Sequence, residues 1–214
     1  MIETIGFFIF SSIRQGVPLL FGATGEIISE KGGQLNLGIP GIMYMGGISG
    51  IIGGYLYEHY CADPVPLFCI LIPLVFTLVG SCLMTLIYSF LTITLRANQN
   101  VTGLALTTFG VGVGNFFGGS LLSFFGESGS ISLITTGQWY QAHLPIADKL
   151  GVFGSTFLSL GFLAYISVII AILTGWFLNK TRTGLHLRAV GENPATADAA
   201  GINVTKYKYL SSLI

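Results

Sequence analysis

The chain has 214 residues, of which 52% are hydrophobic and only 8% are charged, whereas about 25% of the residues of an ordinary soluble domain are charged. So few charged side chains cannot cover the surface of a soluble fold, and the mean hydropathy is +0.77. The composition therefore predicts an all-α protein, a polytopic transmembrane helical bundle. Lys+Arg and Asp+Glu balance at 9 each, which argues against nucleic acid as a partner.

The apolar segments predict five complete membrane spans and the beginning of a sixth in a single membrane domain, residues 1–214. The predicted spans are residues 4–24, 39–57, 67–95, 101–123 and 152–178, with the next one starting at 209–214. Each complete span has roughly the 20 residues that cross a bilayer. A partial span cannot satisfy its backbone in lipid. We therefore expect the chain to be truncated, with further spans following Ile214.

Positively charged residues predict the orientation of the spans. Residues 179–208 contain Lys180, Arg182, Arg188, Lys206 and Lys208, and such clusters mark cytoplasmic loops. Counting back along the chain places residues 124–150 and 58–66 outside the cell. The same count places residues 26–31 and Arg96 inside, and the N-terminus outside.

The glycines of FGVGVGNFFGG (109–119) lie inside a predicted span, not between a strand and a helix as a nucleotide-binding loop requires. GxxxxGK[ST] occurs nowhere in the chain, so we predict no Walker-type ATP site. Four-residue spacing allows helix backbones to approach closely in a membrane, and the glycines predicted to pack helices in this way are Gly46, Gly50, Gly54, Gly114 and Gly118. The chain's histidines, His59, His143 and His186, lack ligand spacing, and we predict no metal site.

Two polar segments interrupt the apolar sequence. GGQLNLGIPG (32–41) has a composition that breaks a helix, and irregular backbone at membrane depth is tolerated against protein or a water-filled cavity. It is either a gate on the substrate path, with Gln34, Asn36 and Gly38 as candidates, or an ordinary cytoplasmic hairpin. RANQNVTG (96–103) adds Asn98 and Thr102 as candidates; the alternative is that Arg96 anchors the span end and that Asn98 and Asn100 cap the next helix.

GENPATADAAGI (191–202) predicts a short helix with both ends marked. Asn193 is a good N-cap, Pro194 suits the first helical position, and Gly201 provides a left-handed C-terminal stop. Two turns extend about 10 Å, and an isolated helix of this length is only marginally stable in water. Its alanine-rich surface suits a groove in another protein; the alternative is a simple connector.

Three stretches resemble one known family, and together they extend from about residue 25 to 208. TRTGLHLRAVGENPATADAAGINVTKYK resembles the cytoplasmic coupling segment of bacterial ABC-importer permeases of the branched-chain amino acid/simple-sugar class. GEIISEKGGQLNLGIPGIMYMGG and LRANQNVTGLAL resemble two further signatures of the same class. The match is nearest to the nucleoside permeases that work with basic-membrane-protein lipoproteins. Lys31 replaces the usual Arg, and Pro40 stands where the family often has Glu.

The resemblance implies a multi-pass permease subunit of the bacterial inner membrane with a short cytoplasmic coupling helix in the loop 179–208. It implies no enzymatic activity and no cofactor in this chain, because ATP binds to a separate ATPase subunit. The implied ATPase-coupling residues are Arg188, Gly191, Glu192, Asn193, Pro194, Ala197, Ala200 and Gly201. The other implied partners are a second homologous permease, an extracytoplasmic substrate-binding lipoprotein and membrane lipid.

Nucleosides are the cargo that the resemblance favours, and several alternatives stay open. The chain could instead belong to a simple-sugar or other small-solute ABC permease. It could also be a facilitator or secondary transporter that works without an ATPase, although membrane-depth Asp, Glu and His are scarce, which counts against proton coupling. A truncated, inactive remnant is the remaining alternative.

Overall fold

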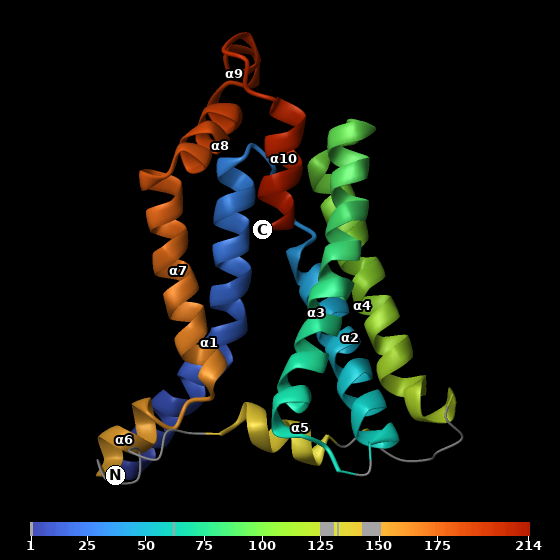
Figure 1. The fold of residues 1–214 in the computed structure, drawn as a ribbon, viewed down its shortest axis with the longest axis vertical. Helices are drawn as coiled ribbons and strands as arrows, with labels where there is room; N and C mark the ends of the chain where they lie inside the picture. Colours follow the sequence, from blue (N-terminus) through green and yellow to red (C-terminus); the bar gives the residue numbers. More distant parts are fainter. Residues whose placement is uncertain (1, 62, 125–130, 132, 143–150) are drawn as a thin grey trace.

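The computed structural model describes residues 2–61, 63–124, 131, 133–142 and 151–214. Within this part, the predicted all-α architecture is confirmed, and five helices are long and apolar enough to cross a membrane. They are α1 (Ile2–Lys31), α2 (Ile39–Tyr60), α3 (Pro66–Ser89) continued by the π-helix η1 (Phe90–Thr94), α4 (Gln99–Phe124) and α7 (Phe162–Lys180). The shorter helices are α5 (Ile134–Tyr140), α6 (Gly151–Phe157), α8 (Arg182–Glu192), α9 (Pro194–Ala199) and α10 (Val204–Leu213) (Figure 1).

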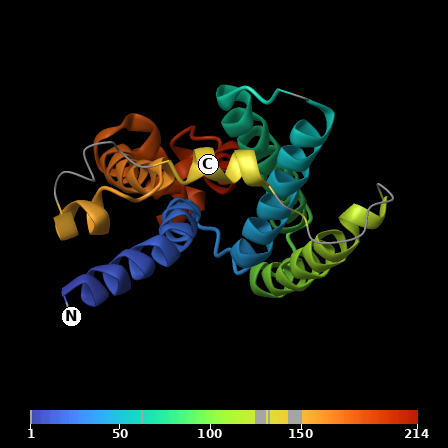
Figure 2. The ribbon, with the colours of Figure 1, turned by 90° about the horizontal axis from the view of Figure 1, so that it is seen from below.

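The long helices form two groups. In the first group, α2 packs against both α3 and α4, around a core of Ile42, Met84, Tyr88 and Leu106. In the second group, α1 packs against α7 and α8, around Ile28, Leu178 and Leu187. Figure 1 shows the groups as two separate columns, with α10 between them near one end. At the other end, α5 lies across the space between them (Figure 2).

The polar segments that the charge pattern assigns to the cytoplasm lie at one end of the molecule. The C-terminal ends of α1 and α7, the helices α8 to α10 and the turn between η1 and α4 all lie at this end, opposite the N-terminus (Figure 1). They carry Lys31, Arg96, Lys180, Arg182, Arg188, Lys206 and Lys208. The arrangement therefore agrees with the predicted grouping of these segments on a single side.

The first helix is longer than the predicted span. Residues 25–31 were expected to belong to a polar connection, but α1 continues through them to Lys31. Gly25 alone does not stop the helix, because the residues that follow it include Ile28 and Ser29, which are buried. Burial of this turn against α7 and α8 outweighs its polar composition.

The prediction of one continuous span at 152–178 is wrong, because the chain there forms α6 and then α7, separated by residues 158–161. The Tyr165 hydroxyl donates a hydrogen bond to the carbonyl of Phe157 (2.9 Å), which satisfies one carbonyl at the break. Gly161 approaches the backbone of Tyr140 at the end of α5 so closely that a Cβ would collide with its carbonyl oxygen. The break therefore allows α5 to sit against the start of α7.

Two predicted loops contain helices. The segment 179–208, in which we expect one short helix, folds into α8, α9 and the first turn of α10. The segment 124–150 contains α5, whose amide of Thr136 donates to Glu58 of α2 (2.6 Å) and whose Tyr140 hydroxyl donates to the carbonyl of Ile70 in α3 (2.7 Å). These hydrogen bonds fix α5 to the first group of helices.

Candidate functional site

Residues 32–38, which we name the connector, join α1 to α2 without regular secondary structure apart from turns. The end of α1 explains where the connector begins. Gly33 has a φ of +78°, the amide of Gln34 donates to the carbonyl of Ser29 (3.0 Å) and the amide of Gly33 donates to that of Glu30 (2.9 Å). This is a Schellman motif, which requires a left-handed residue after the helix.

Side chains from three helices satisfy the backbone of the connector. Glu26 of α1 accepts from the amide of Asn36 (3.1 Å), and Gln99 of α4 accepts from the amide of Leu35 (2.9 Å). The Tyr88 hydroxyl of α3 donates to the carbonyl of Leu35 (2.7 Å). The remaining contacts from α4 are those of Gln99 Nε2 to the carbonyl of Gly33 (3.4 Å) and of Thr107 Oγ1 to that of Leu37 (2.8 Å). The connector is therefore held by α3 and α4 of the first group and, through Glu26, by α1 of the second.

The predicted gate residues have different environments. Gln34 and Asn36 are 1% and 5% exposed, and Gly38 and Thr102 are also buried. Asn36 Oδ1 accepts from the amide of Gly38 (2.9 Å) and so shapes the turn that starts α2. Asn98 is exposed. It accepts hydrogen bonds from the amides of Asn100 and Val101, which makes it the N-cap of α4.

The connector descends into the bundle before α2 begins. A Cβ on Gly103 would lie 2.9 Å from the amide nitrogens of Leu37 and Gly38, so the backbones of the connector and α4 are in direct contact there. Gly41 faces Leu106 and Thr107 of α4 just as closely. Leu106 is seven residues into α4, about 10 Å from its first residue. The first turn of α2 therefore lies beside residues about two turns into α4, and not beside the first residue of α4. The connector is thus not an ordinary surface hairpin.

The predicted short helix is confirmed as α9. Asn193 is its N-cap and accepts from the amide of Thr196 (3.1 Å), and Pro194 occupies the first helical position. Gly201 has a φ of +81°. The amide of Gly201 donates to the carbonyl of Asp198 (2.9 Å) and that of Ile202 donates to Ala197 (3.0 Å), which completes a Schellman motif.

The eight residues expected to couple to an ATPase divide by exposure. Glu192, Asn193, Pro194, Ala200 and Gly201 are exposed. Ala197 is only 3% exposed, so its side chain packs within the chain and does not face a partner. Arg188 is half-buried and donates to Asn179 Oδ1 at the end of α7 (3.2 Å). Gly191 is half-buried and faces α1. The surface that α9 presents is therefore small and made of short side chains, with Asp198 as its charged group.

The two predicted sites touch each other, which the sequence did not indicate. A Cβ on Gly191 would collide with the carbonyl oxygen of Lys31 and lie 3.0 Å from the amide nitrogen of Gly33. A Cβ on Gly32 would collide with the side chain of Ser211 in α10. The last turn of α8 and the last turn of α10 thus lie directly against the backbone of the connector.

The predicted packing glycines are spread over several contacts. Gly46 and Gly50 face Ser81 and Thr77 of α3, and a Cβ on either would collide with a hydroxyl. Gly54 and Gly118 have room for a Cβ, whereas Gly114 lies against the ring of Tyr44. Backbone also meets backbone at glycines that were not predicted to pack helices, among them Gly41, Gly103, Gly110, Gly161, Gly184 and Gly191.

Metal ligands do not gather in the part of the chain that the structure describes. Among those residues, no three His, Cys, Asp or Glu side chains lie together as a metal ion would require. His143 lies outside the described residues. His186 instead pairs with the hydroxyl of Tyr207 through Nδ1 (2.9 Å), which joins α8 to α10.

Comparison with known proteins gives a single family. The family model described as "Branched-chain amino acid transport system / permease component" matches residues 8–214. No solved structure matches the chain significantly.

Three curated relatives match nearly all of the chain. They are the nucleoside ABC transporter permease protein NupC of Lactococcus lactis subsp. cremoris (31% identical, 100% of this chain and 65% of the relative), the putative glucose ABC transporter permease protein TsgC13 of Haloferax volcanii (30%, 95% and 57%) and the guanosine ABC transporter permease protein NupQ of Bacillus subtilis (25%, 100% and 65%). The chain thus spans between about half and two-thirds of the length of these relatives.

Proposed function

Because the chain belongs to the family of permease components of branched-chain amino acid transport systems, we propose that it acts as a transmembrane permease subunit of an ABC importer for nucleosides. Two of the three relatives described above carry nucleoside or guanosine in their names, and the third carries glucose. A simple sugar is therefore the second candidate cargo. The five membrane-spanning helices fit a multi-pass membrane protein, which we place in the bacterial inner membrane.

The observation that carries this proposal is that α8 and α10, which flank the exposed helix α9, both lie directly against the connector. A separate ATPase subunit, which binds and hydrolyses the ATP, would hold α9 in a groove at the end where the cations cluster. The exposed face of α9, with Ala195, Ala199 and Ala200, offers no large side chain that would prevent close docking. A short helix with a smooth surface fits a groove in a partner protein.

Movement of α9 would reach the spans through two contacts. The first is Gly191 against Lys31 and Gly33, and the second is Ser211 against Gly32. Because the connector is also hydrogen-bonded to Tyr88 and Gln99, a push on it moves the start of α2 relative to α1. ATP-driven closure of the ATPase would favour one of two such arrangements, which is a population shift through differential binding.

We further propose that the buried residues Gln34, Asn36, Gly38 and Thr102 shape this gate. Asn98 contributes indirectly by capping α4. The other proposed partners are a second homologous permease, which would complete the translocation path, and an extracytoplasmic substrate-binding lipoprotein, which would deliver cargo on the side of the N-terminus, α5 and α6. Membrane lipid surrounds the apolar outer faces of both helix groups.

The test is to co-purify the full-length chain with the ATPase of the same transport system. Ala199→Trp places a large ring on the exposed surface of α9, and we expect it to abolish co-purification and ATP-dependent uptake of labelled nucleoside. Ala105→Trp is the matched control, because Ala105 is an exposed alanine of α4 remote from α9. This control should retain both activities.

The outcomes separate the alternatives. Uptake of glucose but not of nucleoside by the wild-type complex would show that the cargo is a sugar, and the proposed coupling to the ATPase would still hold. Uptake by the permease without any ATPase would identify a facilitator and contradict the proposal. Retained co-purification in Ala199→Trp would show that α9 only links α8 to α10 and is not the docking helix.

A further inference from the structure

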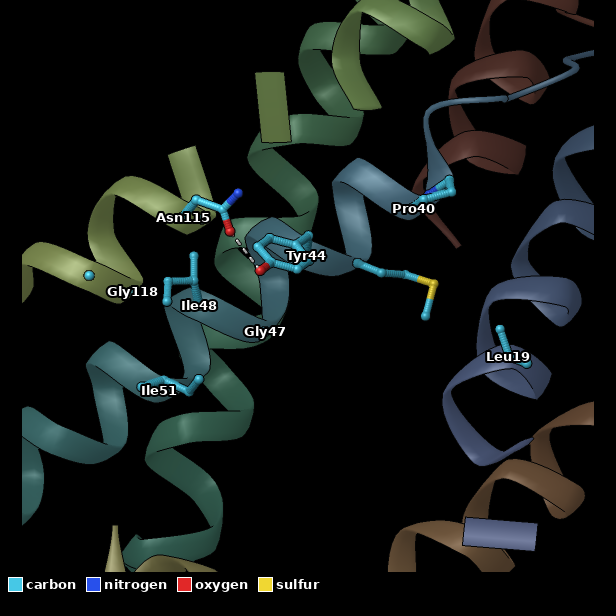
Figure 3. A pocket seen from close by; sticks show the side chains of 11 residues that line it. Leu19, Pro40, Tyr44, Gly47, Ile48, Ile51, Asn115 and Gly118 are labelled. Atoms are coloured by element: carbon cyan, nitrogen blue, oxygen red, sulfur yellow. Dashed lines mark hydrogen bonds between the residues drawn. The ribbon is translucent and has the colours of Figure 1, made fainter. Parts of the chain in front are cut away.

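A cavity of about 770 Å³ lies between α1 and the α2–α4 pair, apart from the coupling contacts described above. Its volume is within the range of about 300–1,000 Å³ that is typical of small-molecule sites. Leu19 of α1 forms the wall opposite Tyr44 and Asn115, which come from α2 and α4 (Figure 3). The other described residues that line it are Pro40, Met43, Gly47, Ile48, Ile51, Gly114, Gly118 and Gly119.

Tyr44 and Asn115 provide the side-chain polarity among these lining residues. The Tyr44 hydroxyl donates to Asn115 Oδ1 (3.0 Å), as Figure 3 shows with a dashed line. The pair still has hydrogen-bonding capacity, because an amide carries two N–H donors and a second lone pair, and the phenol oxygen can accept. Asn115 is exposed and lies 16 residues after Gln99, about 24 Å along α4. A polar side chain within a span is costly in lipid, and such side chains often line a pathway.

The ring of Tyr44 is held in a fixed position. One edge lies against the backbone of Gly114, where a Cβ would collide with two ring carbons. The hydroxyl is tied to Asn115, and yet the side chain is 46% exposed. An immobilised aromatic ring with an open face is a stacking platform for another planar ring.

The lining residues also determine the charge of a suitable ligand. They include no Asp, Glu, Lys or Arg. A charged ligand would lose its hydration without gaining an ionic partner, so the cavity favours an uncharged molecule.

We propose that Tyr44 and Asn115 form a subsite on the translocation path for the uncharged planar ring of the cargo, the base of a nucleoside. Tyr44 stacks on the ring, and the Asn115 amide donates to and accepts from its polar edge. This inference rests on the proposed nucleoside import, because it assigns one part of that cargo to one part of the path. A simple sugar has no planar ring and would meet the open face of Tyr44 only through its C–H groups, so the tests below compare the base with ribose.

The first test measures ATP-dependent nucleoside uptake by the complete transporter with its ATPase and lipoprotein. Tyr44→Leu removes the stacking face, and we expect uptake at low nucleoside concentration to fall about tenfold or more. Tyr44→Phe keeps the ring and Asn115→Leu removes the amide; each should lower uptake about two- to tenfold. Tyr60→Leu and Asn100→Leu are matched controls at exposed positions of the same two helices, outside the cavity, and should leave uptake unchanged.

The second test reads the subsite directly. Asn115→Cys is introduced after Cys61, Cys69 and Cys82 have been replaced, and a charged, membrane-impermeant thiol reagent is applied to the permease–ATPase complex without lipoprotein. We expect the introduced thiol to react, and the reaction to slow severalfold in the presence of saturating nucleoside or its free base but not ribose. Because no lipoprotein is present, protection reports on the permease itself.

Each outcome supports or overturns the subsite. An unreactive thiol in Asn115→Cys would show that lipid or another helix covers the cavity, and equal protection by ribose would exclude recognition of the base; either result overturns the inference. Protein levels and ATPase co-purification identify an uptake variant that fails to assemble. In that case the thiol reaction of Asn115→Cys decides whether the subsite exists. If the wild-type transporter imports no nucleoside, the proposed function fails. The subsite is then judged separately, by whether the free base slows the thiol reaction of Asn115→Cys and ribose does not.

Discussion

The long helices of the two groups meet through different kinds of contact. In the first group, α2 and α4 approach each other backbone to backbone, as at Gly41 against Leu106 and Gly110 against Gly41. In the second group, α1 and α7 meet through apolar side chains, with Ile28 and Leu178 buried together, and backbone meets backbone only where α8 joins them, at Gly184 and Gly191. Glycine contacts resist sliding because backbone atoms cannot yield, whereas side chains can change rotamer.

The difference suggests a division of labour. The α2–α3–α4 group carries two walls of the cavity, whereas the α1–α7–α8 group leads directly to α9. Between them, the connector is hydrogen-bonded to Tyr88 of the first group and to Glu26 of the second, and Gly191 of the second group lies against it. A rigid cargo-facing unit and a driven unit that are joined by the connector and α10 at one end and by α5 at the other form a natural two-state element.

The largest effect is expected from a methyl group placed inside the rigid unit. In Gly110→Ala the new Cβ would meet the backbone of Gly41, which cannot move aside. We expect the free energy of unfolding in detergent to fall by at least about 3 kcal/mol, the upper end of the range for overpacking. Thermal melting of the purified chain measures this loss.

The control for this prediction lies two residues away on the same helix. A Cβ on Gly112 would meet no atom within 4 Å. Gly112→Ala should therefore be neutral or stabilise α4 by about 0.5–1 kcal/mol, because alanine loses less backbone entropy than glycine. Similar losses in the two variants would mean that α2 and α4 do not pack through their backbones.

A smaller loss of stability but a specific loss of function is expected at the joint. In Gly191→Ala the Cβ would push α8 away from the carbonyl of Lys31, at a cost of about 1–3 kcal/mol. The exposed face of α9 is unchanged, so the ATPase should still bind. ATP-dependent uptake should fall about fivefold or more, as expected when coupling between two sites is lost.

Gly175→Ala is the matched control, because Gly175 lies on α7 with nothing within 4 Å of an added Cβ. It should keep both ATPase binding and uptake. If Gly191→Ala abolished ATPase binding as well, its effect would be on the docking surface. If it changed neither property, the contact between α8 and the connector would not carry the movement.

Features that are encoded locally could be predicted from the sequence. The ends of α9 follow from Asn193 and Gly201 alone, because a cap and a left-handed stop act within one turn. The approximate positions of α2, α3 and α4 follow from the apolar runs, which are also local features, because about 20 apolar residues suffice for a span.

Features that depend on distant partners could not be predicted. The last two turns of α1 are polar in sequence, and they are helical because Ile28 packs against residues 178 and 187. The contact between Gly191 and Gly33 joins residues more than 150 positions apart, and neither glycine lies in a spaced series. The position of Tyr88 does predict a buried hydrogen bond, because a phenol within an apolar span requires a hydrogen-bond partner. The sequence does not indicate that the partner is the connector.

The smallest effect is expected at the other side of the joint, where Tyr88 holds the connector. Tyr88 is fully buried, and its hydroxyl donates to the carbonyl of Leu35. Tyr88→Phe leaves that carbonyl without this donor, and we expect a loss of about 1–2 kcal/mol in detergent unfolding, within the range for an unsatisfied buried group.

Tyr165→Phe removes a comparable hydrogen bond to Phe157, but in an exposed position, so it should cost less than about 1 kcal/mol. If the connector belongs to the rigid unit, only Tyr88→Phe should also weaken uptake, since only this variant frees the segment on which α8 presses. Equal losses of stability in the two variants, with uptake intact in both, would mean that the connector moves with α1, and the boundary between the two units would then lie at the start of α2.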